Sequence, residues 1–355
     1  MTPENQQEST PEFGRTGLHL PRIIFGNSYF GNLYRVIPDE TLGAITEQWF
    51  TQTRGPVVID TAGKYGAGLA LENTVRQLRK LEINPDRVVI SNKLGWMRVP
   101  LVAEEPTFEP GIWAELKHDA EQRIGYEEIL ECWEQGCGLL DEYTPSLVSV
   151  HDPDEYLDAA ASASDRAKRM ESICDAYRAL HELKNQGRVR AVGVGAKNWR
   201  IIEELYDLVS LDWIMFANSL TIMNHPPELV GFMERTSEDG LGLINSAVFH
   251  GGFLTGGSFF DYRPVEESCP GDASLFEYRA RLNAQCERWE VDPATACVQF
   301  ALAAPGVSSV ALNTSNPARV EKNVDAGQCQ LPASFWKDLR EEGLIAPDYA
   351  YLPNK

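Results

Sequence analysis

Eight short apolar runs, rich in β-branched residues, alternate with longer amphipathic segments between about residue 20 and residue 330. This alternation is typical of parallel strands joined by crossover helices. Several runs are almost purely apolar, as in Val57-Val58-Ile59, which indicates strands covered on both faces. The expected strands are Arg22–Phe25, Val57–Thr61, Val88–Lys93, Leu147–Val150, Val189–Val194, Trp213–Ala217, Gly242–Ala247 and Ser309–Leu312.

The segments between these runs have apolar residues at helical spacing. Two examples are Leu71, Val75, Leu78 and Leu81, and Ile173, Tyr177, Leu180 and Leu183. Eight strands with eight helices fit a closed barrel better than an open doubly wound sheet, which usually stops near six strands. No GxGxxG motif follows the first run, so the nucleotide-binding fingerprint of the open sheet is also missing. We therefore expect one α/β domain over residues 1–355, a (β/α)8 TIM barrel, with residues 1–12 flexible.

Length and charge agree with this fold and exclude several partners. A chain of 355 residues lies within the range that α/β barrels occupy as one domain. Asp and Glu number 52 against 32 Lys and Arg, a formal net charge of −20, which would repel nucleic acid and anionic membranes. The seven cysteines are scattered without a CxxC or metal-binding spacing, and no apolar stretch resembles a signal peptide. We expect a cytoplasmic protein with no metal.

Two connections are unusually long for a compact barrel. They run from Gly95 to Gly125 after the third strand and from His250 to Ser274 after the seventh. Long loops in such folds are usually functional, and these two would lie at the end of the barrel where active sites form.

Polar residues at the carboxyl ends of three strands form the candidate catalytic set. Asp60 and Tyr65 follow the second strand, Lys93 ends the third, and His151 follows the fourth. A phenol with an ordinary pKa near 10 needs a neighbour to act as an acid or base at neutral pH. We expect the Lys93 ammonium to lower the pKa of Tyr65, Asp60 to hold Lys93, and His151 to bind the reacting oxygen.

These residues resemble the pattern of the aldo-keto reductases, in which Asp-(x)4-Tyr-Gly is followed by Lys and then His. The residues from His151 to Leu157 are similar to the branch that contains sugar 1-dehydrogenases of the L-fucose and D-threo-aldose type. The resemblance implies an N-terminal β-hairpin at Gly14–Leu18, an extra C-terminal helix, and hydride transfer between NAD or NADP and a sugar or small carbonyl substrate. It also implies a monomer or a small homo-oligomer.

The resemblance also implies which residues bind the cofactor. The segment after the eighth strand would meet the adenosine phosphate, with Thr314, Ser315 and Arg319 near the 2′-phosphate and Asn323 near the adenine. Asn198, Asn245 and Ser246 would lie near the nicotinamide. Asn313 stands where many NADP-dependent members have lysine, so use of NAD, or of both cofactors, stays open.

The sequence also departs from the family around the nicotinamide. Gly195-Ala196-Lys197-Asn198 replaces a common Ser-Asn pair, and Ala217 replaces a common glutamine. The amide contacts would therefore be rebuilt with Asn198 or Lys197. Trp96 is the tryptophan best placed to line a sugar pocket, whereas Trp113 and Trp133 are interpreted as packing residues.

Two other functions stay open at this point. Some barrels that resemble this family bind the cofactor as regulatory subunits of potassium channels with little turnover. Asp152 and Asp154 follow His151 and could suggest a metal-dependent isomerase or hydrolase. The metal site of such an enzyme would usually need a second histidine or a cluster of carboxylates, and nothing in the spacing of these residues requires that function. The substrate and the favoured direction are not predicted.

Overall fold

The computed structural model describes residues 12–261 and 263–353. Its centre is a closed barrel of eight parallel strands in the order β1-β12-β9-β8-β7-β6-β3-β2. The strands are β1 (Ile23–Gly26), β2 (Val57–Ala62), β3 (Val88–Leu94), β6 (Leu147–His151), β7 (Ala191–Ala196), β8 (Trp213–Ala217), β9 (Gly242–Ser246) and β12 (Val307–Leu312). The predicted (β/α)8 barrel is confirmed.

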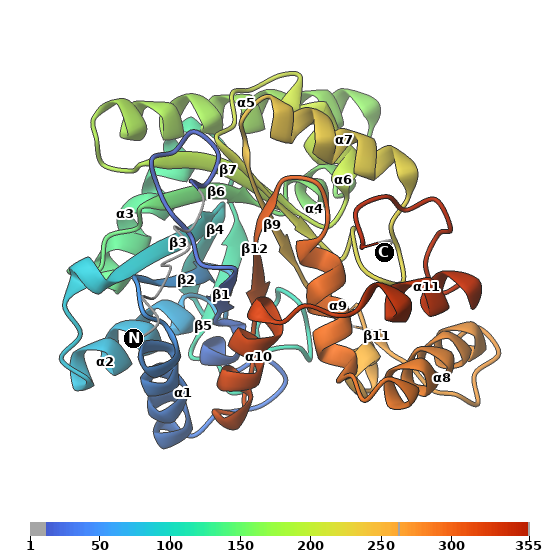
Figure 1. Ribbon diagram of the computed structural model, residues 1–355. Coiled ribbons are helices and arrows are strands. Elements are labelled where there is room, and N and C mark those ends of the chain that lie inside the picture. The colour runs from blue at the N-terminus through green and yellow to red at the C-terminus, as the bar shows by residue number, and fades with distance from the viewer. Residues whose placement is uncertain (1–11, 262, 354–355) are drawn as a thin grey trace, which may run out of the picture.

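Helices surround the barrel (Figure 1). They are α1 (Asp39–Gln52), α2 (Leu69–Lys80), α3 (Tyr126–Leu140), α4 (Pro153–Asp158), α5 (Ala163–Asn185), α6 (Trp199–Tyr206), α7 (Pro227–Glu238), α8 (Ala273–Arg288), α9 (Pro293–Leu302), α10 (Ala318–Gln328) and α11 (Ala333–Glu341), with short 3-10 turns at Ser28–Gly31, Pro85–Arg87 and Phe253–Thr255. The extra helix predicted near the C-terminus is α11. None of the described helices is long and apolar enough to cross a membrane.

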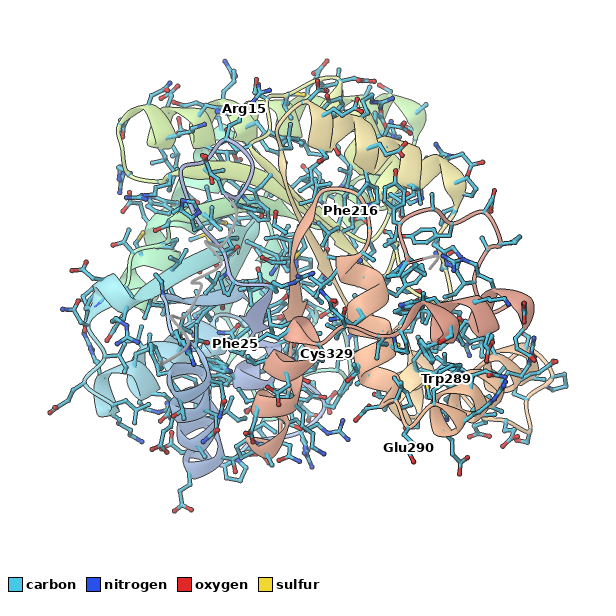
Figure 2. The ribbon with its side chains drawn as sticks, in the orientation of Figure 1. Arg15, Phe25, Phe216, Trp289, Glu290 and Cys329 are labelled. Carbon is cyan, nitrogen blue, oxygen red and sulfur yellow. The ribbon has the colours of Figure 1, made fainter. Side chains whose placement is uncertain are left out.

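The strand side chains that point outward pack against these helices. Phe25 of β1 stacks on Trp49 of α1 with ring centroids 5.3 Å apart, and Phe216 of β8 meets Phe232 of α7 edge to face at 6.1 Å. Figure 2 labels Phe25 and Phe216 among the side chains of the barrel. Burial of such large aromatic surfaces stabilises the two-layer arrangement. It explains why nearly pure apolar runs form the strands.

The predicted N-terminal hairpin is present at the end of the barrel where the strands begin. Glu12 pairs with His19, and Phe13 is fully buried against Trp213 at the start of β8. A side chain on Gly242 would clash with the Phe13 ring, so glycine lets the hairpin close that end. The expectation of flexibility over residues 1–12 falls, apart from Glu12, outside the described residues.

The predicted strand bounds differ from the structure by at most two residues. The largest shift is in β7, which covers residues 191–196 where 189–194 was expected. The long connections contain structure that periodicity did not predict. An antiparallel pair, β4 (Trp96–Pro100) and β5 (His118–Gln122), follows β3, and β10 (Phe259–Phe260) pairs with β11 (Arg263–Pro264) after β9.

Candidate active site

A cavity of about 370 Å³ opens at the carboxyl ends of the barrel strands. Both long connections border it, with Trp113 coming from the segment between β4 and β5 and Gly252 and Thr255 from the segment after β9. The cavity therefore lies at the end of the barrel that the sequence predicted, and loops of two different strands shape it.

The floor of the cavity holds a buried chain of three polar groups. The Lys93 ammonium lies 2.6 Å from a carboxylate oxygen of Asp60 and 3.2 Å from the phenol oxygen of Tyr65. Both charged side chains of the pair are about 5% exposed or less. The second and third strands are neighbours in the barrel, and this adjacency places the groups within hydrogen-bonding distance. The structure thus brings together Asp60, Tyr65 and Lys93.

His151 completes the predicted set from the next strand. Its ring lies edge-on to the Tyr65 ring, with centroids 5.7 Å apart. Burial is the main reason that its pKa lies well below 6.5, so the imidazole is neutral. Its Nδ1 is buried and has no hydrogen-bond partner among the described residues. A neutral imidazole can donate a hydrogen bond to a carbonyl oxygen or accept one from a hydroxyl.

The pKa of Tyr65 does not follow the expected direction. Burial raises it well above 10, and the carboxylates of Asp60 and Asp152 raise it further, against a lowering by the Lys64 ammonium. The expectation of a lowered pKa is therefore wrong for the protein without ligands, because it weighed the nearby ammonium and not the desolvation of the phenolate. The phenol is protonated at neutral pH and can donate a proton.

A second lysine directly precedes the tyrosine in the chain. The Lys64 ammonium is 2.9 Å from Glu109, 3.1 Å from Asp152 and 2.7 Å from Glu155. Lys197 also pairs with Glu155. This cluster was not predicted, although a lysine directly before the tyrosine and acidic residues directly after His151 are signals in the sequence.

The far end of the cavity carries hydroxyl, amide and guanidinium groups. Of the predicted cofactor-binding residues, Thr314, Ser315, Arg319 and Asn323 lie here, and Ser246 lines the cavity at the end of β9. Helix α10 begins at Ala318 in the same place, so backbone N–H groups of its first turn lie there too. The cavity thus extends from Tyr65 to a region of hydrogen-bond donors, and donors of these types fit the phosphates of an extended dinucleotide.

Three other predicted residues lie outside the cavity lining. Asn245 is fully buried and donates to the carbonyl of Leu220, and Asn198 caps α6 by accepting from the N–H of Arg200. The ring of Trp96 lies 4.7 Å from the Lys64 ammonium. Of the two residues expected at the nicotinamide amide, Lys197 lines the cavity and Asn198 does not, and Trp113 lines it where Trp96 was expected.

No group of three or more His, Cys, Asp or Glu among the described residues has an arrangement that could hold a metal ion. The ionic groups around Tyr65 instead pair with one another.

The structure is thus a closed parallel (β/α)8 barrel with a buried Asp-Lys-Tyr chain at the carboxyl ends of its strands. The model of the Aldo/keto reductase family matches residues 22–342, and the chain belongs to this family. Its members are oxidoreductases that use nicotinamide cofactors.

Curated relatives match almost the whole chain. A pyridoxal 4-dehydrogenase of Microbacterium luteolum is 26% identical and aligns with 94% of this chain and 97% of its own length. A D-threo-aldose 1-dehydrogenase of a Pseudomonas species is also 26% identical, with 94% and 98% covered. An L-galactose dehydrogenase of Arabidopsis thaliana is 22% identical, with 88% and 86% covered.

Solved structures support the fold. An aldo-keto reductase from Bacillus halodurans in its holo form superimposes with a TM-score of 0.68 at 17% identity, and covers 97% of this chain and 99% of its own. A glycerol dehydrogenase from Gluconobacter oxydans gives the same TM-score at 16% identity, with 95% and 96% covered.

Proposed function

We propose that the protein transfers a hydride between NAD or NADP and the carbonyl or alcohol carbon of a sugar or small aldehyde, with Tyr65 as the general acid and base. The observation that carries this proposal is the 3.2 Å contact between the Lys93 ammonium and the Tyr65 phenol at the floor of the cavity. Catalytic proton transfer needs a titratable group held in place beside the reacting atom.

The named activities of the relatives support the substrate class. All three curated relatives are dehydrogenases, and two are named for sugars. The cavity combines an indole from Trp113 with charged groups from the β6 and β7 ends. Aromatic faces suit the C–H faces of a sugar, and charged groups suit its hydroxyls.

In the reducing direction, Tyr65 donates its proton to the substrate oxygen while His151 hydrogen-bonds the same oxygen. Lys93 stabilises the phenolate that remains, and Asp60 holds the ammonium at 2.6 Å. In oxidation, Tyr65 as phenolate accepts the hydroxyl proton. Because the pKa of Tyr65 is raised, the phenol is protonated at neutral pH and can donate its proton when the substrate is reduced.

The cofactor, when bound, supplies or takes up the hydride. Ser246 and Lys197 border the part of the cavity next to the catalytic residues, and Thr314, Ser315, Arg319 and Asn323 would hold the adenosine phosphate end. Arg319 favours the 2′-phosphate of NADP. Asn313 is uncharged at the position where many NADP-dependent members have a lysine, whose charge would strengthen that preference. We propose that both cofactors bind.

A panel of aldoses, aldehydes and hydroxy compounds, assayed with NAD⁺, NADP⁺, NADH and NADPH, tests this function. We expect turnover of at least one hydroxylated carbonyl compound with one of the four cofactors. Tight binding of NAD(P)H without turnover of any of these compounds would contradict an enzymatic role and indicate a cofactor-binding subunit.

A further inference from the structure

The ionic cluster around Lys64 acts on Tyr65 only through its charges, because the hydrogen bond to the phenol comes from Lys93. Lys64 is 2% exposed and directly precedes Tyr65 in the chain. An ammonium has three N–H donors, and three carboxylates lie within 3.1 Å of this one. So many ionic contacts around one buried lysine need an explanation beyond the stability of the barrel, because buried ion pairs often add little to it.

The cluster contains more acceptors than donors. Glu109, Asp152 and Glu155 contribute three carboxylates, whereas Lys64 and Lys197 contribute two ammonium groups. Each carboxylate can accept about four hydrogen bonds, so the lysines leave acceptor capacity unused. The neutral His151 adds no positive charge. A ligand that donates several hydrogen bonds would complement this cluster.

The cluster faces the same space as the catalytic phenol. Lys64, Glu109, Asp152 and Lys197 all line the cavity that holds Tyr65. The Asp152 carboxylate lies 3.6 Å from Nε2 of His151, so an acceptor on Asp152 adjoins the residue that would hold the reacting oxygen. A hydroxyl on a carbon next to the reacting carbon would therefore reach it.

Asp152 and Glu109 come from different parts of the chain, and Lys64 joins them. Asp152 has a left-handed backbone, with φ of 48° and ψ of 54°, directly after β6. Glu109 belongs to the β4–β5 connection and accepts a hydrogen bond from the indole N–H of Trp113. Lys64 thus links the β6 end to the loop that places an aromatic ring in the cavity.

We propose that Asp152 and Glu109 bind hydroxyl groups of the substrate next to the reacting carbon, and that Lys64 is the positioning residue that holds both carboxylates in place. The substrate class is then a polyhydroxylated carbonyl compound, in preference to a simple alkanal. This inference rests on the proposed function. An alkanal has no donors for these carboxylates and leaves them without new partners, which is costly at a desolvated site.

Threose and butanal test the inference, because they have four carbons each and differ in their hydroxyls. The variants are Asp152→Asn, which tolerates the left-handed backbone, Glu109→Gln, and Lys64→Met with Lys64→Arg as the conservative replacement. Glu104→Gln, an exposed change in the same connection, is the matched control. Initial rates of reduction are measured at saturating NADPH or NADH, and melting temperatures check the fold.

We expect the kcat/KM for threose to fall roughly tenfold to a hundredfold in Asp152→Asn and Lys64→Met, chiefly through KM. The value for butanal should fall much less, so that the ratio of the two values drops by about tenfold. Glu109→Gln should give a smaller drop in the ratio, Lys64→Arg should recover part of it, and Glu104→Gln should leave it as in the wild type. Equal losses for both substrates, or a ratio that none of the variants changes, would overturn the inference.

A binding measurement separates this inference from the proposed function. Calorimetric titration of the complex with NADPH or NADH compares threitol with 1-butanol, neither of which can react with the reduced cofactor. If the wild type turns over threose, butanal and every other compound of the panel with none of the four cofactors, the proposed function loses its support, and the titration still decides the inference. Threitol binding that weakens about tenfold or more in Asp152→Asn supports it. Threitol binding that is absent in the wild type or equal in the variants overturns it.

Discussion

Two lysines flank Tyr65, and they have opposite relations to the carboxylates around them. Lys93 has one carboxylate partner, Asp60, and its ammonium also contacts the phenol. Lys64 has three carboxylate partners and, among the described residues, makes no hydrogen bond to the phenol. Lys93 therefore contacts the reacting group, and Lys64 holds the carboxylates beside it.

The difference shows how one cavity can separate proton transfer from substrate recognition. A balanced pair such as Asp60 and Lys93 leaves a donor directed at a single atom, where charge develops during the reaction. A cluster with excess acceptors suits a ligand with many donors. Variants of the shared tyrosine and of each lysine should therefore affect different kinetic constants.

Removal of the phenol hydroxyl should have the largest effect. We expect Tyr65→Phe to lower kcat by roughly a hundredfold or more, because the general acid and base is lost. The ring and its packing on Trp113 remain, so the dissociation constant of NADPH, measured by fluorescence titration, should stay close to that of the wild type. Unchanged turnover would contradict the assignment of Tyr65.

Replacement of Lys93 should have the next largest effect. In Lys93→Met the phenol oxygen loses its donor and the buried Asp60 loses its counter-ion. We expect kcat to fall at least roughly tenfold and the free energy of unfolding to fall by about 3–5 kcal/mol, measured by urea denaturation. The comparison with Lys64→Met is decisive, since that variant should affect KM for a hydroxylated substrate more than kcat. The same kinetic pattern in both variants would refute the division of roles.

The adenosine end should show a smaller effect, restricted to one cofactor. If Arg319 contacts the 2′-phosphate, Arg319→Ala should raise KM for NADPH by about tenfold and leave KM for NADH nearly unchanged. Initial rates at fixed substrate and varied cofactor measure both values. An equal rise for the two cofactors would show that Arg319 does not distinguish them.

Much of the fold was predictable because the barrel strands are continuous apolar runs. Val57-Val58-Ile59 could hardly form anything but a strand with both faces covered, and β2 follows it. The β4–β5 pair was not predicted, because Trp96–Pro100 and His118–Gln122 are half-polar strands 17 residues apart, and pairing over that distance leaves no local periodicity.

The site was predictable where residues lie at strand ends, and less so where loops place them. Asp60, Lys93 and His151 belong to adjacent strands, so their convergence follows from barrel order. Trp113 and Glu109 reach the cavity through the fold of a long connection, which sequence spacing does not specify. The raised pKa of Tyr65 depends on burial, a property of the assembled cavity.

The pH dependence of the two reaction directions tests the central claim most directly. A phenol with a pKa well above 10 stays protonated from pH 6 to pH 9, so the initial rate of reduction at saturating cofactor should be flat over this range. The phenolate fraction rises about tenfold per pH unit below the pKa, so the rate of oxidation should rise by the same factor. A rate of oxidation that levels off near pH 7, or a rate of reduction that falls between pH 6 and pH 9, would contradict a buried phenol as the acid and base.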